Sequence, residues 1–411
     1  MKVLWITNIM MPPLAKAKAL PVPAIGGWMY SSLKRLFTQN DIEMAVATVY
    51  NGKLYDTSCI DNIKYYLIPL DGKKAVEYNP GIEAYWHRIH DEFHPDVVHI
   101  HGSEYPHGLA YINACGPSGV VVSIQGLISV YTRYYASGIA FSDTKKTTFR
   151  DKIRRDGILR GQKSFEKRGR FEIELLSHVN HIIGRTEWDK AHAWAINPKA
   201  QYHHCGETLR DSFYNHRWVY EKCEPHSIFV SQASYPIKGV HMLFEALPLI
   251  LHHYPDTKVY VAGYDSTVAP WWRIGSYGKY LKKMIARLGI SEHIEFTGML
   301  DEKAMCDRYL KSNLFVCCSA IENSPNSLGE AQLLGMPYVA SFVGGVPEIA
   351  GMNADVLYRF EETEMLAKKI CDIFALGSSY KPAQYDASMY DGAANTQSLL
   401  ETYRQICLNQ Q

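Results

Sequence analysis

The stretch that most constrains the fold of this chain runs from residue 314 to residue 351, LFVCCSAIENSPNSLGEAQLLGMPYVASFVGGVPEIAG. Its apolar start, residues 314–318, predicts a buried strand. A polar loop follows at residues 319–326, and then a run of good helix formers that ends at a glycine. A second strand is predicted at residues 338–342. Strand, loop, helix and strand in this order indicate a parallel sheet, in which ligands bind at the carboxyl ends of the strands.

Two glutamates of this stretch are candidate site residues, although each has an ordinary explanation. Glu322 falls in the polar loop, where an acidic side chain is by default solvated. Glu330 follows Ser327 in the Ser-x-x-Glu pattern of a capping box, and an acid in the first turn of a helix also suits the helix dipole. The two glutamates alone therefore do not carry a function.

The motif around the two glutamates is far more specific. Glu322 is followed after seven residues by Glu330, then by Gly335-Met336-Pro337 and by Gly344-Gly345-Val346-Pro347-Glu348-Ile349. In this order and spacing the chain resembles the family-4 retaining glycosyltransferases (glycosyl transferase group 1), nucleotide-sugar enzymes of the GT-B fold. The resemblance covers most of the C-terminal half and, more weakly, the N-terminal half.

Strand and helix patterns alternate twice along the 411 residues, over about 200 residues each. The predicted fold class is α/β, with two Rossmann-like doubly wound domains facing across a cleft, the GT-B arrangement that the resemblance implies. An N-terminal, acceptor-side domain is predicted at residues 1–215, with residues 385–411 crossing back onto it. A C-terminal, nucleotide-sugar-binding domain is predicted at residues 225–384. The segment 210–225, at their junction, has no clear period and is interpreted as the linker.

In the N-terminal half, a glycine pair and a histidine are candidate site residues. Gly26 and Gly27 precede a predicted helix, where a glycine pair lets backbone N–H groups approach an anion, although a plain turn explains it as well. His99 and His101 share one face of a predicted strand. His99 reads as a core histidine, whereas His101 ends the strand. The resemblance implies that the glycine loop lies near the donor phosphates and that His101 faces the acceptor and the donor.

In the C-terminal half, the resemblance implies that charged residues bind the donor. Lys238 would offset charge on the leaving diphosphate, and a lysine at a helix N-terminus runs against the helix dipole. Glu330 would accept the ribose hydroxyls, and Glu322 would lie near the transferred sugar. The predicted catalytic residues are thus His101, Glu322 and Lys238. The other predicted donor-binding groups are N–H groups at the start of one helix, those of Asn326, Ser327 and Leu328.

The chain departs from the family pattern at two places. Gln125 stands where the family often has the histidine of His-Gly, which puts that histidine's contribution in doubt. Gln232-Ala233 replaces the family's Gly-Arg, so that one of two expected cations for the diphosphate is missing. Either another arginine, such as Arg273, substitutes, or the donor binds more weakly, or the donor differs.

No cofactor or metal is expected, because the nucleotide-sugar is a co-substrate and the chain has no Asp-x-Asp pair. The Gly-x-Gly-x-x-Gly fingerprint is also missing, which argues against a nicotinamide dehydrogenase. A metal site from His99, His101 and His107 is conceivable, but no carboxylate pattern near them supports it.

The segment 143–170 is strongly basic, with eleven Lys or Arg and four Asp or Glu, a net charge of 11 − 4 = +7. Most charge runs are solvated helical faces, but the aromatic and aliphatic residues interleaved here also suit anionic lipid headgroups or an acidic acceptor. Nucleic acid is the weaker candidate, because the whole chain carries a net charge of only +1.

The nine cysteines form no Cys-x-x-Cys pair, which predicts reduced thiols and a cytoplasmic location. The N-terminal MKVLWITNIMMPP has too short an apolar core for a signal peptide and predicts a first strand instead. No apolar run approaches the ~20 residues of a membrane span. A peripheral position on the inner face of the plasma membrane, through residues 143–170, is compatible with these features.

The resemblance implies retaining transfer of a sugar from a nucleotide-diphosphate donor to a hydroxyl of a glycan or lipid-linked acceptor, in surface polysaccharide or glycolipid assembly. Gln125 and Ala233 motivate an alternative, a catalytically weakened nucleotide-sugar-binding protein of the same fold. A nucleotide-sugar epimerase is a second alternative, which the Glu322 and Glu330 motif disfavours.

Overall fold

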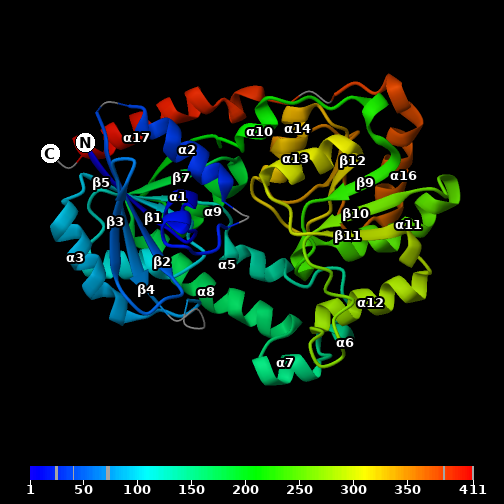
Figure 1. The fold of residues 1–411 in the computed structure, drawn as a ribbon, viewed down its shortest axis with the longest axis horizontal. Coiled ribbons are helices and arrows are strands. Elements are labelled where there is room, and N and C mark those ends of the chain that lie inside the picture. Colours follow the sequence, from blue (N-terminus) through cyan, green and yellow to red (C-terminus); the bar gives the residue numbers. More distant parts are fainter. Residues whose placement is uncertain (24–25, 40, 71–74, 383–384, 410–411) are drawn as a thin grey trace. The chain divides into compact units, whose positions relative to one another are not determined.

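The computed structural model describes residues 1–23, 26–39, 41–70, 75–382 and 385–409, so part of the loop before Gly26 lies outside the described residues. The chain forms two compact units (Figure 1). Unit 1 comprises Met1–Val130, Ser164–Leu209 and Ser388–Gln411, and unit 2 comprises Tyr131–Lys163 and Arg210–Ala387.

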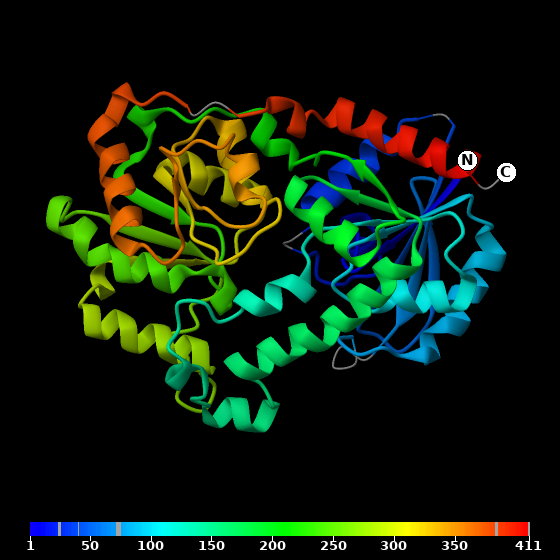
Figure 2. The same cartoon turned by 180° about the vertical axis from the view of Figure 1, so that it is seen from behind.

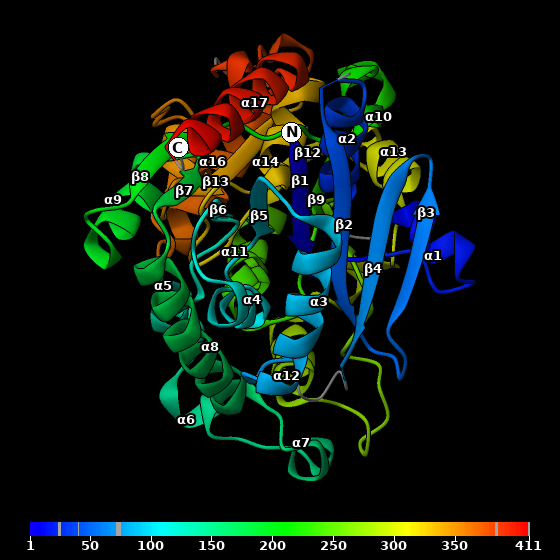
Figure 3. The same cartoon turned by 90° about the vertical axis from the view of Figure 1, so that its left-hand side faces the viewer.

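Unit 1 is built on an eight-stranded sheet of order β3-β4-β2-β1-β5-β6-β7-β8 (Figure 3). All neighbours are parallel except β3, which pairs antiparallel with β4. The strands are β1 Lys2–Thr7, β2 Glu43–Tyr50, β3 Asp56–Ile60, β4 Ile63–Pro69, β5 Val97–His101, β6 Val120–Ser123, β7 His181–Gly184 and β8 Gln201–His204.

Helices cover both faces of this sheet, because alternate residues of its central strands are apolar and buried. The helices of unit 1 are α1 Pro12–Ala17, α2 Gly27–Phe37, α3 Glu83–Phe93, α4 His107–Cys115, α5 Ile128–Tyr131, α9 Glu187–Ile196 and α17 Gly392–Leu408, with η2 at Pro80–Ile82 and η8 at Ala387–Tyr390. Leu4 of β1 packs with α3 and α4, whereas Trp5 packs with α2 and α17.

Unit 2 is built on a six-stranded sheet that is parallel throughout, of order β11-β10-β9-β12-β13-β14. Counted from β9, this is the doubly wound order 3-2-1-4-5-6 of a Rossmann fold. The strands are β9 Glu224–Val230, β10 Lys258–Ala262, β11 Ile294–Gly298, β12 Ser312–Cys317, β13 Tyr338–Ser341 and β14 Leu357–Tyr358. The two sheets confirm the predicted α/β class with two Rossmann-like domains.

The helices of unit 2 join these strands, and α11 and α16 pack against each other (Figure 2). They are α6 Phe141–Thr144, α7 Phe149–Arg154, α10 Asp211–Tyr214, α11 Val240–His253, α12 Ser276–Leu288, α13 Glu302–Lys311, α14 Asn326–Leu334, α15 Val346–Ile349 and α16 Thr363–Leu376. Short 3-10 turns are η3 Thr132–Tyr134, η4 Tyr220–Lys222, η5 Pro236–Lys238, η6 Ser291–His293 and η7 Gly377–Ser379. Helix α8, Ile158–His178, has its first turns in unit 2 and the rest in unit 1.

The basic segment differs from its predicted placement in the N-terminal domain, because its first part packs in unit 2. The carboxylate of Asp151 accepts a hydrogen bond from the N–H of Ser276, at 2.9 Å, and the hydroxyl of Ser276 accepts one from the N–H of Ile158, at 3.2 Å. Both bonds are buried and tie α7 and the start of α8 to α12. Local charge and periodicity give no information on such long-range partners.

The predicted linker is also part of unit 2. It contains α10 and η4, and the indole of Trp218 donates a hydrogen bond to the carbonyl of Ser312, at 2.7 Å. The missed strand β3 is an edge strand whose residues are at most half-buried, so it lacks the apolar alternation that marks the others.

No helix of the described residues is long and apolar enough to span a membrane. All nine cysteines are free thiols.

Stability should depend on pH through His241, which is fully buried on α11. Its Nε2 donates to the carbonyl of Ser137, at 2.9 Å, and its Nδ1 lies 3.1 Å from the hydroxyl of Tyr277. Burial lowers the pKa of His241 to about 4, although the Ser137 carbonyl opposes this shift. Between about pH 6.5 and 4 the unfolded chain therefore binds a proton that the folded chain does not, so that stability falls as the pH falls.

We expect His241→Gln to remove about 1.4 kcal/mol per pH unit from this dependence, measured by urea unfolding between pH 6.5 and 4.5. His252→Gln, at an exposed position of the same helix, is the control. An unchanged slope for His241→Gln would contradict the assignment.

Candidate functional site

The central feature of unit 2 is an ion pair at the point where its strand order reverses. Lys238 follows β9 and Glu322 follows β12, and these strands are neighbours in the sheet. The Lys238 ammonium lies 2.6 Å from the Glu322 carboxylate. Ligands of doubly wound sheets bind at the carboxyl ends of the strands at such a switch point. Two residues 84 positions apart in the sequence are thus brought to the edge where a ligand is expected.

Glu322 is buried rather than solvated, with 8% of its surface exposed. Its Oε1 also accepts a hydrogen bond from the hydroxyl of Ser319, at 2.7 Å. Burial by itself lowers the pKa of Lys238, but the adjacent Glu322 carboxylate, together with Tyr235 and Cys317, raises this pKa above its usual value. The ordinary interpretation of Glu322 as a surface residue is therefore wrong.

Two glycines allow close backbone contacts around the Lys238–Glu322 ion pair. Gly239 has a φ of 68°, and a Cβ there would lie 1.8 Å from the carbonyl oxygen of Cys318. Gly344 has a φ of 54°, and a Cβ there would lie 1.9 Å from the carbonyl oxygen of Glu322. The N–H of Gly345 donates to that same carbonyl, at 3.1 Å. The Lys-Gly and Gly-Gly parts of the motif thus let the chain pass close to the loop that carries Glu322.

The start of α14 offers two of the three predicted N–H groups. Pro325 is the N-cap, and its carbonyl accepts a hydrogen bond from the N–H of Leu328, at 2.9 Å. The N–H of Leu328 is therefore already engaged, contrary to the prediction. Within the described part of the chain, the N–H groups of Asn326 and Ser327 have no hydrogen-bond partner, as is usual for the first turn of a helix.

Glu330 is held by an arginine that the sequence analysis assigns to the linker. Arg210 donates from Nε and Nη2 to the two carboxylate oxygens of Glu330, both at 2.6 Å. Only 3% of Glu330 is exposed. Burial raises the pKa of Glu330, and the Arg210 guanidinium opposes this shift. Each carboxylate oxygen can still accept a second hydrogen bond.

The capping-box interpretation of Glu330 is wrong. Pro325 caps α14 without a side-chain hydrogen bond, and Glu330 is the fifth residue of the helix rather than a member of its first turn. Arg273, the suggested substitute for the missing cation, is exposed in a loop. Arg210 is instead the arginine buried beside the motif.

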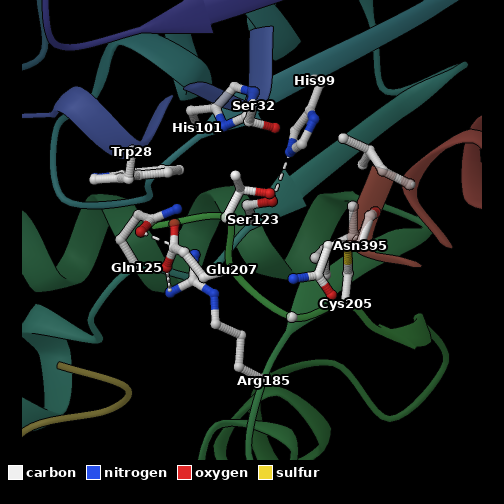
Figure 4. Close-up of a pocket in the computed structure, with 14 residues that line it drawn as sticks. Trp28, Ser32, His99, His101, Ser123, Gln125, Arg185, Cys205, Glu207 and Asn395 are labelled. Atoms are coloured by element: carbon white, nitrogen blue, oxygen red, sulfur yellow. Dashed lines mark hydrogen bonds and ion pairs between the residues drawn. The ribbon is translucent and has the colours of Figure 1, made fainter. Parts of the chain in front are cut away.

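Unit 1 has a second candidate site, a pocket of about 40 Å³ at the carboxyl ends of its strands (Figure 4). His101 ends β5, the neighbour of β1 where this strand order also reverses, and its side chain lines the pocket. Only 6% of His101 is exposed, and neither ring nitrogen has a hydrogen-bond partner among the residues that the structure describes. Burial, with smaller contributions from His99 and Arg185, lowers the pKa of His101 well below its usual value. The neutral ring thus presents one unpaired donor and one unpaired acceptor.

A chain of hydrogen bonds fixes the tautomer of His99 beside it. The Trp5 indole, which can only donate, donates to the hydroxyl oxygen of Tyr403, at 3.0 Å. Tyr403 then donates to Nδ1 of His99, at 2.6 Å, and the protonated Nε2 of His99 donates to the hydroxyl oxygen of Ser123, at 2.5 Å. The Ser123 hydroxyl, which lines the pocket, keeps its own proton for a further acceptor. Burial, and then Arg185, lowers the pKa of His99 to about 3.

The pocket also contains a buried ion pair that the sequence analysis missed. Nη1 of Arg185 lies 2.7 Å from Oε2 of Glu207, and Nη2 donates to Oε1 of Gln125, at 3.0 Å. Burial raises the pKa of Glu207 to about 7, against the opposing charge of Arg185. Gln125, where the family often has a histidine, is therefore part of a polar cluster, and within the described parts of the chain its Nε2 has no hydrogen-bond partner. No spacing pattern in the sequence indicates that Arg185, Glu207 and Gln125 lie close together.

Gly26 and Gly27 begin α2. Gly26 is the N-cap with a φ of 82°, and a Cβ there would lie 2.8 Å from the side chain of Ile9. Trp28 of the same helix lines the pocket beside His101, with ring centroids 6.3 Å apart. The glycine pair thus lies directly before Trp28, which lines the pocket.

The suggested histidine metal site is not formed. His99 and His101 stack on each other at 3.7 Å, whereas His107 stacks on Tyr105. The described residues contain no cluster of three or more His, Cys, Asp or Glu side chains that could hold a metal ion.

A family comparison covers the half of the chain that holds the ion pair. The model of the family described as glycosyl transferases group 1 matches residues 215–387. This part of the chain is thus similar to that family. The matched residues include Lys238, Glu322 and Glu330, while Arg210 lies just before them.

The curated relatives match over part of their length. Spore coat protein SA of Bacillus subtilis is 30% identical over 159 residues, which are 38% of this chain and 40% of that protein. The GDP-mannose-dependent alpha-(1-6)-phosphatidylinositol monomannoside mannosyltransferase of Mycolicibacterium smegmatis is 29% identical over 120 residues, 28% of this chain and 29% of that protein. The chain thus spans about two fifths or less of the length of these relatives.

Solved structures with the same fold cover nearly the whole chain. Sucrose-phosphate synthase from Thermosynechococcus elongatus has a TM-score of 0.65 at 14% identity, over 99% of this chain and 96% of that one. HepE from Anabaena, in complex with UDP, has a TM-score of 0.57 at 15% identity, over 100% and 98%. The chain therefore has the GT-B fold of these proteins.

Removing Arg210 tests the Arg210–Glu330 pair. We expect Arg210→Ala to lower the free energy of unfolding by about 3–5 kcal/mol in urea, because the buried Glu330 carboxylate loses its partner. Arg210→Met combined with Glu330→Gln should lose less, since it leaves no unpaired charge.

Lys303→Ala, in an exposed ion pair of α13, is the control and should change stability little. An Arg210→Ala protein as stable as this control would show that the pair is not a buried stabilising unit.

Proposed function

We propose that the protein transfers a glycosyl group, with retention of configuration and without a metal, from a nucleotide-diphosphate sugar to a hydroxyl of a glycan or lipid-linked acceptor. The observation that carries the proposal is the Lys238–Glu322 ion pair at the switch point of unit 2, within the residues that match the glycosyl transferases group 1 model. Fold alone does not imply function. Lys238 is a buried, paired cation, and the chain that carries its partner Glu322 continues into the start of α14 with its N–H groups. A cation and helix N-terminal N–H groups are suited to bind a diphosphate.

Lys238 can serve the diphosphate without leaving Glu322. An ammonium group has three donors, and one of them is used by Glu322. The other two can bind phosphate oxygens, together with the N–H groups of Asn326 and Ser327. These groups stabilise the charge that gathers on the leaving diphosphate, and Glu322 lies near the transferred sugar.

Glu330 binds the ribose hydroxyls, and Arg210 acts as its positioning residue. The bidentate guanidinium occupies one acceptor position on each carboxylate oxygen and fixes the plane of the carboxylate. Two acceptor positions remain for the ribose. Glu330 can therefore still bind the donor, although Arg210 already donates a hydrogen bond to each of its carboxylate oxygens.

The transfer is front-side, so that no protein nucleophile is needed. The departing phosphate takes the proton of the acceptor hydroxyl on the face where the new bond forms. In unit 1, the neutral His101 and the Ser123 hydroxyl supply unpaired polar groups for sugar hydroxyls. His101 thus orients hydroxyls rather than carrying a charge.

The comparisons support a nucleotide-sugar donor but leave several nucleotides open. One relative is named as GDP-mannose-dependent, and one structural neighbour was solved with UDP. We propose that the protein belongs to family 4 and acts in surface polysaccharide or glycolipid assembly, in the cytoplasm at the inner face of the plasma membrane. Nine free thiols suit that compartment.

A catalytically weakened nucleotide-sugar-binding protein is the second candidate. Ala233 is buried where the family has an arginine, so that Lys238 is the remaining cation of the expected pair. In this case the donor would bind at the same residues and no sugar would move.

Donor turnover tests the proposal. Wild-type protein is incubated with UDP-, GDP- and ADP-sugars and a cell-envelope acceptor extract, release of the nucleoside diphosphate is followed, and the linkage of the product is determined by NMR. We expect one donor to react with retention. Lys238→Met should lower kcat by about 10²–10³, because charge on the leaving group loses its stabilisation.

Activity should persist in a chelator such as EDTA, and Lys303→Gln, on an exposed face of the same unit, should leave kcat unchanged. If one nucleoside diphosphate binds but no donor is turned over, the binding-protein alternative holds. If activity needs a divalent metal, the metal-independent mechanism is wrong.

A further inference from the structure

Unit 2 has a pocket between the α6–α7 segment and α12, and neither Lys238 nor Glu322 lines it. Its volume is about 220 Å³, and a space for one water needs only about 10–15 Å³. It is therefore large enough for a phosphate group with part of its substituent. The lining residues come from two segments: Asp143, Lys146, Thr147 and Thr148 from the first, and Ser276, Lys279, Tyr280 and Lys283 from α12.

The pocket is basic. Lys146 pairs with Asp143, whereas Lys279 and Lys283 have no ion-pair partner among the residues that the structure describes. Lys279 and Lys283 are four positions apart on one helix face, where like charges repel. Lys279 is also in the first part of α12, where a cation opposes the helix dipole. An anion in the pocket would relieve both unfavourable interactions.

Two hydroxyls of the pocket are set to donate. The Thr148 oxygen accepts a hydrogen bond from the N–H of Asp151, at 3.2 Å, and the Ser276 oxygen accepts one from Ile158. Since each oxygen already accepts, its own proton is left for another acceptor. Lysine ammonium groups and hydroxyl donors together suit the oxygens of a phosphate.

Large aromatic side chains are exposed beside this pocket. Phe149 follows Thr148 and is 50% exposed, while Trp271 and Trp272 are 70% and 51% exposed. The Phe149 ring lies 5.5 Å from the Trp271 ring, which lies 5.9 Å from the Trp272 ring. Ile153, four residues after Phe149 on α7, is exposed as well. Exposed apolar side chains that gather in one place mark an interaction site.

Basic side chains surround these aromatic side chains, and the acidic side chains nearby are buried or already have partners. Exposed basic residues of the same segments are Lys145, Lys146, Lys152, Arg154, Arg155, Lys279, Lys282 and Lys283. Asp151 is buried and Asp156 pairs with Arg150, at 2.8 Å. Asp265 accepts hydrogen bonds from Thr267. Figures 1 and 3 show α6, α7 and α12 near one another.

We propose that this surface binds an anionic lipid bilayer, with the headgroup phosphate of an acidic lipid in the pocket and Phe149, Trp271 and Trp272 at the interface. Tryptophan prefers the headgroup level of membranes, and basic side chains are attracted to acidic lipids. The exposed aromatic side chains favour a lipid over a soluble phosphate compound, because they can insert at a membrane interface and a phosphate in the pocket would not contact them. The inference rests on the proposed membrane location but assigns the contact to unit 2.

Vesicle co-sedimentation of the full chain tests this inference, with vesicles of phosphatidylcholine alone or mixed with phosphatidylglycerol. We expect binding to the mixed vesicles only, weakened by salt. Lys279→Gln with Lys283→Gln, and separately Trp271→Ala with Trp272→Ala, should each weaken binding at least tenfold. All four side chains are exposed, so that the variants should fold, as circular dichroism can verify.

Matched controls are Lys303→Gln with Lys311→Gln, two exposed lysines of α13, and Trp194→Ala, an exposed tryptophan of unit 1. These should bind vesicles as the wild type does. Absence of binding to the mixed vesicles, or equal loss in the controls, would overturn the proposal. Binding of glycerol phosphate in the pocket without any vesicle binding would also overturn it, in favour of a soluble ligand.

Nucleoside diphosphate binding by the same variants separates this proposal from the donor site. If vesicle binding is lost in the variants while nucleotide binding is kept, the lipid surface is distinct. A protein that binds vesicles but turns over no donor would leave this inference standing while the proposed transferase activity fails.

Discussion

The ion pair between Lys238 and Glu322 is the interaction on which the site of unit 2 depends. Burying two charges is costly, and the cost is offset only when they pair closely and are hydrogen-bonded. The order of the strands brings β9 and β12 together, and Gly239 and Gly344 let the backbone pass close to the Glu322 loop. Helix α14 begins at Asn326, shortly after Glu322 in the chain. A parallel sheet, two glycines and one ion pair thus bring together, from segments far apart in the sequence, the residues of the proposed diphosphate site.

The pocket of unit 1 is lined largely by neutral polar groups instead of charged ones. These include His101, which burial keeps uncharged, and Ser123, whose hydroxyl is oriented through His99 by the C-terminal helix α17. Tyr403 of α17 is therefore structural and also sets which atom of His99 carries the proton. Arg185 and Glu207 add a buried ion pair to the same pocket. Neutral, directional donors and acceptors suit sugar hydroxyls, whereas the charges of unit 2 suit phosphates.

Much of the fold could be predicted from the sequence, because the buried strands of a parallel sheet are continuous apolar runs. The strands predicted at residues 314–318 and 338–342 are present as β12, Ser312–Cys317, and β13, Tyr338–Ser341. Edge strand β3 lacks such a run and was missed. Arg210 could not be connected to Glu330, because a partner 120 positions away leaves no local pattern. For the same reason the contact of residues 143–163 with α12 was not foreseen. The glutamate motif was found, but the burial of both carboxylates was not.

The central claim is that Lys238 binds the diphosphate of a nucleotide. Calorimetric titration of UDP, GDP and ADP, each beside its own nucleoside, tests this claim most directly on wild-type protein and Lys238→Met. The account predicts that one nucleoside diphosphate binds the wild type more tightly than its nucleoside, and that Lys238→Met loses this difference while it still binds the nucleoside. Equal affinity for nucleoside and diphosphate in the wild type, or an undiminished affinity for the diphosphate in Lys238→Met, would contradict it.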